Sequence, residues 1–121
     1  MAKILVVDDE KNIRTLYEAE LSDEGYDVVT AASAKEAYEL LESGVFDVVV
    51  LDIRMPEEDG IKALEKIMVK RRDISVLINS AYSSYKDNFL TWLAEDYVIK
   101  SADVKELKAK IAQILSKKGK A

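Results

Sequence analysis

Residues 4–10 read Ile-Leu-Val-Val-Asp-Asp-Glu, and residues 48–52 read Val-Val-Val-Leu-Asp. Both stretches are short, continuously apolar runs that end abruptly in carboxylates. Apolar residues at every position of such a run are typical of a strand covered on both faces, as in a parallel sheet. The two stretches therefore predict a parallel sheet with acidic side chains where its strands end.

Segments of strand length alternate with segments of helical period along the chain. The predicted strands are residues 3–7, 27–31, 48–51, 75–79 and 97–99. The predicted helices are residues 12–24, 34–43, 61–71, 84–94 and 104–116. Strict alternation of this kind implies an α/β fold, in which helices cover both faces of a parallel sheet and the crossovers are right-handed.

Local signals mark several of the helix ends. Gly25 and Gly44 stand where the first two helices should stop, because glycine is the residue that most often follows a helix. Ser33 and Asp103 are each followed three residues later by a glutamate, the pattern of a capping box. We therefore expect helices to begin directly after Ser33 and Asp103.

Composition limits the class of protein. The chain has 121 residues, which fits one domain over residues 1–121, with 116–121 as a frayed tail or the start of a linker. Hydrophobic residues make up 49%, enough for a core, and no apolar run approaches the roughly 20 residues that a membrane span needs. The first residues do not resemble a signal peptide, so we expect a cytoplasmic location and no membrane partner.

Missing residue types exclude several kinds of chemistry. The chain has no cysteine and no histidine, so disulfides, thiolate metal sites, a histidine base and a phosphohistidine on this chain are excluded. The net charge of −5 argues against direct binding of nucleic acid. The carboxyl-terminal lysines are interpreted as a solvated helix face with favourable charges at a helix end.

Chemically matched residues follow four of the five predicted strands. In an open α/β sheet, ligands bind outside the carboxyl ends of the strands. Any one of these residues could be an ordinary cap or turn residue, but together they predict a site. They are Asp8, Asp9 and Glu10 after the first strand, Asp52 after the third, Ser80 after the fourth and Lys100 after the fifth.

Carboxylates that share a cleft raise one another's pKa or require a cation. Ligands that are all oxygen favour Mg²⁺, which binds few carboxylates and keeps positions open for phosphoryl oxygens. These parts suit phosphoryl transfer to a carboxylate, with Asp52 as nucleophile and the metal offsetting charge on the transferred group. Lys100 would act as a point cation on a phosphoryl oxygen, and the Ser80 hydroxyl would donate a hydrogen bond.

Four motifs resemble the receiver domain of two-component response regulators. They are residues 4–10, residues 50–56 with Asp59 and Gly60, residues 79–81 and residues 96–100. The resemblance covers essentially the whole chain. It implies a doubly wound (βα)₅ sheet with the flavodoxin-like strand order 2-1-3-4-5. It also implies Mg²⁺ as cofactor and a donor histidine on a sensor histidine kinase or a histidine phosphotransfer protein, as in a phosphorelay.

The resemblance also implies roles for individual acidic residues. Asp52 matches the residue that is phosphorylated to an aspartyl phosphate. Asp9 and Asp52, with the backbone carbonyl of Arg54, match the Mg²⁺ ligands, and Asp8 would act through a bound water.

A second set of residues matches the part of the family that senses phosphorylation. Ser80 and Lys100 match the pair that contacts the phosphoryl group, and Tyr97 matches the switch aromatic; an ordinary core tyrosine is the alternative. The switch would alter the face formed by helix 84–94, the fifth strand and the last helix. Tyr85 and Trp92 on that helix suggest a docking or dimer face, and simple packing of the helix is the alternative.

The chain departs from the family pattern at two positions. Ser101 follows Lys100 where the family usually has proline, often after a cis peptide bond. A cis bond before a residue other than proline costs about 2.5–4 kcal/mol, so we expect the Lys100–Ser101 bond to be trans. Leu93 stands where the family often has glycine, and it could extend the fourth helix.

Three other functions fit the sequence less well. A haloacid-dehalogenase-like phosphatase also uses a strand-end aspartate with Mg²⁺, but it needs a second aspartate where this chain has Arg54. A nucleotide-binding function would need a glycine-rich phosphate-binding loop, which this sequence does not contain. A pseudo-receiver that only binds partners is not favoured, because the acidic residues and Lys100 are all present. We expect a signalling switch limited to its own phosphorylation and slow dephosphorylation, either stand-alone or part of a longer regulator with an unknown output.

Overall fold

The computed structural model describes residues 2–52, 62, 66, 67, 73–80, 96–99 and 104–119, with the main chain alone at 80, 96, 97 and 99. Five strands form one parallel sheet in the order β2-β1-β3-β4-β5, as predicted. The strands are β1 (Lys3–Val7), β2 (Asp27–Ala31), β3 (Val48–Leu51), β4 (Ser75–Ser80) and β5 (Asp96–Ile99). The last two are each one residue longer than predicted, β4 at its end and β5 at its start.

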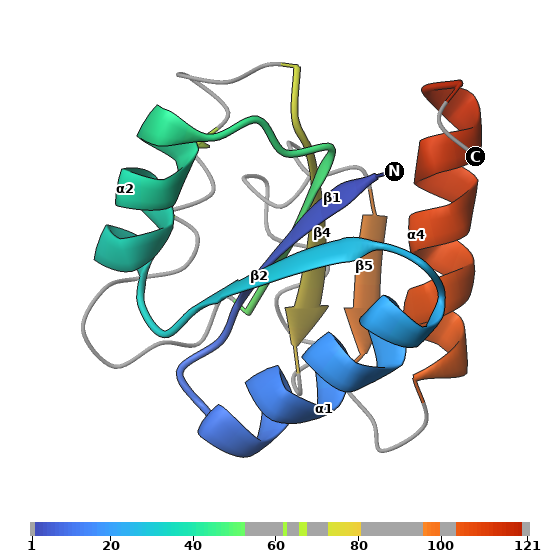
Figure 1. Cartoon of the computed structure of the whole chain (residues 1–121), viewed down its shortest axis with the longest axis horizontal. Helices are drawn as coiled ribbons and strands as arrows, with labels where there is room; N and C mark the ends of the chain where they lie inside the picture. Colours follow the sequence, from blue (N-terminus) through green and yellow to red (C-terminus); the bar gives the residue numbers. More distant parts are fainter. Residues whose placement is uncertain are drawn as a thin grey trace.

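Helices cover both faces of the sheet (Figure 1). The helices are α1 (Lys11–Asp23), α2 (Ala34–Ser43) and α4 (Lys105–Lys117). Of the predicted helix 61–71, the described residues Lys62, Lys66 and Ile67 are helical. The remainder of that segment and the whole of 84–94 lie outside the described residues. None of the helices in the described part of the chain combines the length and apolarity that a membrane crossing requires.

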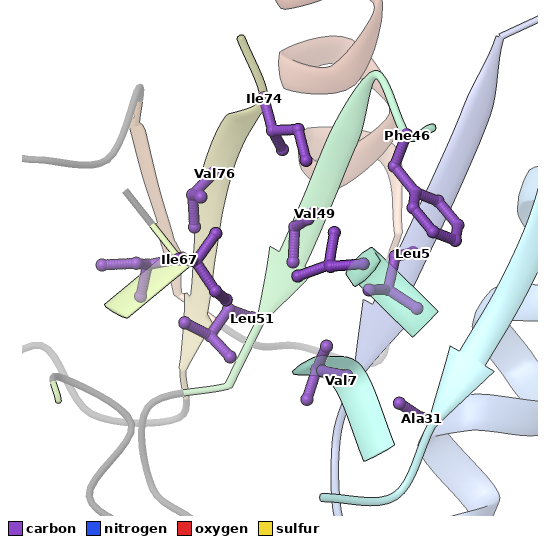
Figure 2. Close-up of a cluster of buried hydrophobic side chains, with 12 residues drawn as sticks. Leu5, Val7, Ala31, Phe46, Val49, Leu51, Ile67, Ile74 and Val76 are labelled. Atoms are coloured by element: carbon purple, nitrogen blue, oxygen red, sulfur yellow. The ribbon is translucent and has the colours of Figure 1, made fainter. Parts of the chain in front are cut away.

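The core lies in two layers because successive side chains of a strand point to opposite faces. Leu5 and Val7 of β1 pack toward α2, whereas Ile4 and Val6 pack toward α1 and α4. Figure 2 shows the first layer, in which side chains of β1, β2, β3 and β4 meet. Two covered faces explain why β3 is apolar at every position and β1 at every position after Lys3.

Two glycines act at helix ends for different reasons. Gly25, directly after the C-cap of α1, has a φ of +92°, which residues with a Cβ rarely adopt. Gly44, at the end of α2, has an extended backbone instead. A Cβ on Gly44 would lie 3.1 Å from both the Leu40 carbonyl oxygen and the Phe46 ring, so a larger residue would need these neighbours to move by a few tenths of an ångström.

The capping prediction holds for one helix and is wrong for the other. Ser33 Oγ accepts a hydrogen bond of 3.2 Å from the Glu36 N–H at the start of α2. At α4 the N-cap position belongs to Val104, not Asp103, and no side chain caps the helix there. The side chain of valine has no oxygen that could accept such a bond, so the second capping box does not form.

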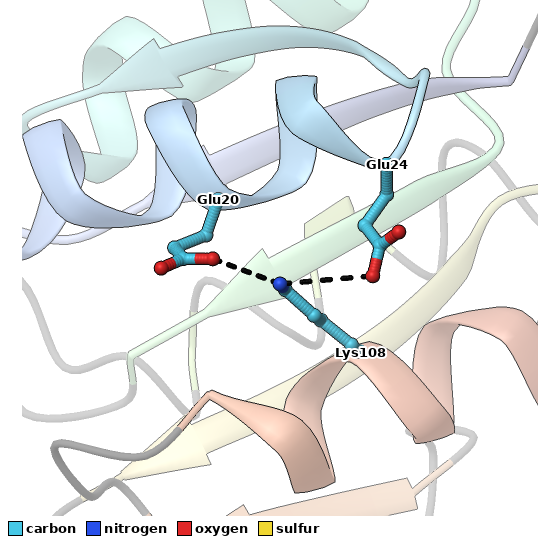
Figure 3. A network of polar contacts seen from close by, with 3 residues as sticks. All are labelled: Glu20, Glu24 and Lys108. Atoms are coloured by element: carbon cyan, nitrogen blue, oxygen red, sulfur yellow. Dashed lines mark hydrogen bonds and ion pairs between the residues drawn. The ribbon is translucent and has the colours of Figure 1, made fainter.

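A lysine connects the two helices that share one face of the sheet (Figure 3). Lys108 Nζ of α4 lies 2.8 Å from Glu20 Oε2 and 3.6 Å from Glu24 Oε1. Glu20 lies in α1, and Glu24 is the C-cap residue of that helix. The hydrogen bond to Glu20 raises the pKa of the Lys108 ammonium. The ammonium, which is charged at neutral pH, joins α1 to α4 and keeps its proton to a higher pH than an ordinary lysine.

Lys118, directly after α4, has a structural role that its place in a lysine-rich tail did not predict. Its Nζ donates hydrogen bonds to the carbonyl oxygens of Asp47, at 2.7 Å, and Asp73, at 3.0 Å. Asp47 directly precedes β3, and Asp73 lies two residues before β4. Lys118 thus ties the end of α4 to the amino ends of two central strands.

Candidate functional site

Two buried carboxylates stand side by side where β1 and β3 end. Val7 and Leu51 are register partners, and Asp8 and Asp52 are the residues that follow them. The Asp52 N–H donates to the Val7 carbonyl oxygen at 3.0 Å, which extends the pairing of the strands by one step. Asp8 is 1% exposed and Asp52 5%. The apolar strands therefore hold both carboxylates in fixed places at the carboxyl edge of the sheet.

The turn between β1 and α1 fixes Asp8 at three points. Its N–H donates to the Ala31 carbonyl at 3.1 Å, and its Oδ1 accepts from the Glu10 N–H at 2.9 Å. Its carbonyl oxygen accepts a hydrogen bond of 2.8 Å from Arg14 Nη1, one turn into α1. Asp8 is thus held by its main chain to the neighbouring strand and to the helix that follows, and by its carboxylate to its own turn.

An acidic cluster begins at Asp8 and continues along this turn. Carboxylate oxygens of Asp8, Asp9 and Glu10 all lie within 4.8 Å of one another, with Asp8 buried and the other two exposed. Like charges this close favour a bound cation, because the cation offsets their repulsion. A donor set of oxygens alone suits a hard cation such as Mg²⁺. The residues present therefore fit the expected metal.

The structure places part of the predicted phosphoryl-sensing set. Ser80 is the last residue of β4 and is paired in register with Ile99, the residue before Lys100. Tyr97 lies in β5, paired with Ile78. The main chain of Ser80 thus reaches the edge where Asp8 and Asp52 stand. The structure does not describe the side chains of Ser80 and Tyr97. Six further residues named from the sequence lie wholly outside the described residues: Arg54, Tyr85, Trp92, Leu93, Lys100 and Ser101.

Sequence reasoning did not assign three residues that the structure brings to this edge. Glu10 was noted beside the aspartates but not as a member of the metal set, and Arg14 was not singled out. Asn79 appeared only inside a motif, yet it is buried at the end of β4 and contacts Tyr17. The signals were available: an arginine one turn after the acidic residues, and an amide at a core position of an apolar strand.

Comparison with known families agrees with this geometry. The family described as the response regulator receiver domain matches residues 4–112. The chain belongs to this family. "Probable transcriptional regulator ycf27" of Guillardia theta is 40% identical over 98% of this chain, which covers 47% of that protein. "Transcriptional regulatory protein ZraR" of Escherichia coli K12 is 41% identical over 93% of this chain, which covers 26% of that protein.

Solved receiver structures share the whole fold. The response regulator TrrA of Thermotoga maritima, solved in complex with Mg²⁺-BeF, has a TM-score of 0.91 and 43% identity. The match covers 95% of this chain and 100% of TrrA. A CheY-like receiver domain of Methanospirillum hungatei has a TM-score of 0.93 at 29% identity, over 99% of this chain and 98% of that one.

The matches differ in how much of each matched protein this chain covers. It spans about half or less of the length of the curated relatives named above, whereas it corresponds to nearly all of the two solved chains. It therefore matches only a part of those longer regulators. The family match gives no support to the phosphatase or to the pseudo-receiver alternative.

Proposed function

We propose that this receiver domain is a phosphorylation-dependent switch in which Asp52 accepts a phosphoryl group from a phosphohistidine. The observation that carries the proposal is the placement of buried Asp52 beside Asp8, with the rest of the acidic cluster at the same edge of the sheet. The donor is a sensor histidine kinase or a phosphotransfer protein. In support, TrrA, which is 43% identical to this chain, has also been solved in complex with the histidine kinase ThkA.

The proposed step is an in-line displacement at phosphorus. A carboxylate oxygen of Asp52 forms the new P–O bond while the P–N bond to the donor imidazole breaks, and the imidazole leaves with a proton from solvent. Mg²⁺, when bound, would supply positive charge that offsets the charge on the transferred group. Asp9, Asp52 and the carbonyl of Arg54 would hold the ion, and Asp8 would act through a water. The Mg²⁺-BeF bound to TrrA supports this assignment.

Readout is assigned to Ser80, Lys100 and Tyr97. A phosphoryl group adds about −1.5 to −2 charges and new hydrogen-bond acceptors beside Asp52. The Ser80 hydroxyl would donate to it and Lys100 would act as a point cation, after which Tyr97 would change its packing. The end of β4 at Ser80 and the pairing of Ser80 with Ile99 support these roles, because they bring both chain segments to the site.

The wider function follows the same pattern. The chain would act as one domain over residues 1–121 in the cytoplasm, without membrane or nucleic-acid contact of its own. It would signal to an output domain or target through segment 84–94, β5 and α4, where a dimer could also form. Because Arg54 stands where a haloacid-dehalogenase-like phosphatase needs its second aspartate, Asp52 would turn over only its own phosphoryl group and not outside substrates.

The test is incubation with acetyl phosphate and Mg²⁺, followed by intact-mass measurement. We expect a gain of one phosphoryl group in the wild type and none in Asp52→Asn or with a chelator. Asp27→Asn is the matched control, since Asp27 is exposed at the amino end of β2, and it should label as the wild type does. A phosphoryl group that persists in Asp52→Asn, or without divalent ion, would overturn the proposal.

A further inference from the structure

One polar pair crosses the apolar layer between the sheet and α1. Asn79 Nδ2 of β4 donates a hydrogen bond of 2.7 Å to the hydroxyl oxygen of Tyr17 on α1, across 62 positions of sequence. Both residues are 2% exposed, and Tyr17 belongs to the cluster formed with Leu77, Val98 and Ile111. Burying an amide and a hydroxyl is unfavourable unless they bond, and two apolar residues of similar size would fill the same space. Packing alone does not explain the pair.

The pair lies at the level of the acidic site. Val7, Leu51 and Ile78 are register partners across β1, β3 and β4. The residues that follow them are Asp8, Asp52 and Asn79, so the amide belongs to the same layer as the two buried carboxylates. The residue after Asn79 is Ser80.

Helix α1 is thus tied to the site at two places. Arg14 Nη1 bonds the carbonyl oxygen of Asp8, and Tyr17, three residues later, bonds Asn79. Residues three apart on a helix lie on neighbouring positions of one face. A hydrogen bond constrains distance and direction more narrowly than an apolar contact. These two bonds therefore fix the end of β4 relative to the end of β1 through the same helix.

We propose that Tyr17 and Asn79 are positioning residues for the phosphoacceptor site, which hold the end of β4 so that Ser80 can meet a phosphoryl group on Asp52. The inference rests on the function proposed above. Mg²⁺ binding should depend little on the pair, because the proposed ligands follow β1 and β3 and none lies on β4. Binding of a phosphoryl mimic should depend on it, because that step needs β4 in place.

The experiment compares three variants with the wild-type chain. The variants are Tyr17→Phe, the double variant Tyr17→Phe/Asn79→Leu, and the control Tyr26→Phe, which also loses a hydroxyl from a residue packed against the same cluster. Two affinities are measured by calorimetry: that for Mg²⁺ alone and that for beryllium fluoride in saturating Mg²⁺. Thermal unfolding and circular dichroism report stability and folding.

We expect Tyr17→Phe and the double variant to bind beryllium fluoride about five-fold more weakly, the effect of losing one hydrogen bond. Mg²⁺ affinity should stay within about two-fold, and Tyr26→Phe should match the wild type in both titrations. The double variant replaces both polar groups by apolar ones. We therefore expect it to unfold at a higher temperature than Tyr17→Phe but to bind beryllium fluoride no more tightly than Tyr17→Phe does.

The double variant shows whether Tyr17 and Asn79 position the site or serve only the stability of the fold. If the double variant is stable and binds beryllium fluoride as tightly as the wild type, the pair serves folding alone and the inference is overturned. The same conclusion follows if Mg²⁺ affinity falls as much as beryllium fluoride affinity does. A wild-type chain that binds Mg²⁺ but not beryllium fluoride would instead overturn the proposed function, together with the inference that rests on it.

Discussion

Asp8 and Asp52 keep their carboxylates where apolar strands leave them almost no contact with water. Burial of a charge is costly unless hydrogen bonds or a counter-ion compensate. At Asp8 one carboxylate oxygen accepts the Glu10 N–H, and the neighbouring carboxylates of Asp9 and Glu10 add charge of the same sign. At the scale of the residue, the site therefore favours a cation.

Asp9 provides a test of this charge balance because it is exposed and its replacement should leave the fold intact. Asp9→Asn removes one charged oxygen ligand, and we expect Mg²⁺ affinity to fall at least about ten-fold, equivalent to ~1.4 kcal/mol. Isothermal titration with MgCl₂ measures this change. Asp27→Asn makes the same substitution far from the cluster and should bind Mg²⁺ as the wild type does. Equal affinities for the two variants would remove Asp9 from the metal set.

Individual site residues were predictable only where the strand pattern places them. Asp8, Asp9 and Asp52 follow continuously apolar runs, so sequence order alone puts them at one edge of the sheet. The hydrogen bond between Tyr17 and Asn79 joins residues 62 positions apart, so no local sequence pattern predicts it. In the sequence, Tyr17 simply fits the apolar stripe of a helix. Its hydroxyl acquires a role only when β4 is placed opposite α1.

Among the elements that the structure describes, α1 links several parts of the site. It begins beside the acidic cluster, contacts the end of β4 through Tyr17, and is joined to α4 by Lys108. A shift of α1 would therefore disturb its contacts with both the sheet and α4.

The α1–α4 link should depend on salt and pH. Lys108→Gln removes the ammonium between Glu20 and Glu24, so we expect a lower unfolding temperature at low ionic strength. The difference should shrink in about 1 M NaCl, where charges are screened beyond about 3 Å. Lys35→Gln, on the exposed face of α2, is the matched control and should change little in either buffer.

The sign of the pH effect follows from the raised pKa of Lys108. Its hydrogen bond with Glu20 is the leading cause, so the stabilisation is present below the ordinary lysine pKa of 10.5. It should be lost as the pH rises through the higher pKa of the folded state. Thermal unfolding of wild type and Lys108→Gln across this range measures the effect. A difference that grows with pH would contradict the assignment.

Element boundaries show where sequence rules sufficed. The first three strands and α2 have the bounds that periodicity and turn residues predicted. Gly25 was correctly placed by its preference for positive φ. The start of α4 was placed wrongly, because the sequence pattern at Asp103 and Glu106 cannot show that Val104 takes the capping position. Caps depend on the backbone path of the preceding loop as well as on residue type.

At the scale of the whole molecule, one sheet separates two apolar layers, and the site lies where both layers end. The fold class was predictable because a strict alternation of strands and helices leaves few topologies open. The strand order was predictable only through the resemblance to receiver domains. The edge that carries the candidate site follows from that topology, since all parallel strands present their carboxyl ends on the same side. What remains specific to this chain is which polar residues are buried there.

The layer between the sheet and α1 and α4 should be essential for global stability. Leu77 is fully buried in it, and Leu77→Ala should lower the free energy of unfolding by about 2–5 kcal/mol through lost contacts and a cavity. Val45 is 72% exposed, so Val45→Ala should stay within about 0.5 kcal/mol of the wild type. Urea denaturation followed by circular dichroism measures both. A small loss in Leu77→Ala would show that this layer is not a tightly packed core.

The proposed function is the transfer of one phosphoryl group to one carboxylate, and chemical trapping can identify that carboxylate. The chain is phosphorylated with acetyl phosphate and Mg²⁺ and then treated with sodium borohydride, which reduces an acyl phosphate to an alcohol. Peptide mass spectrometry then locates the aspartate that has become homoserine. We predict homoserine at position 52 alone, dependent on Mg²⁺. Homoserine at Asp8 or Asp9, or no homoserine in a chain that binds Mg²⁺, would contradict the assignment of Asp52 as the phosphoacceptor.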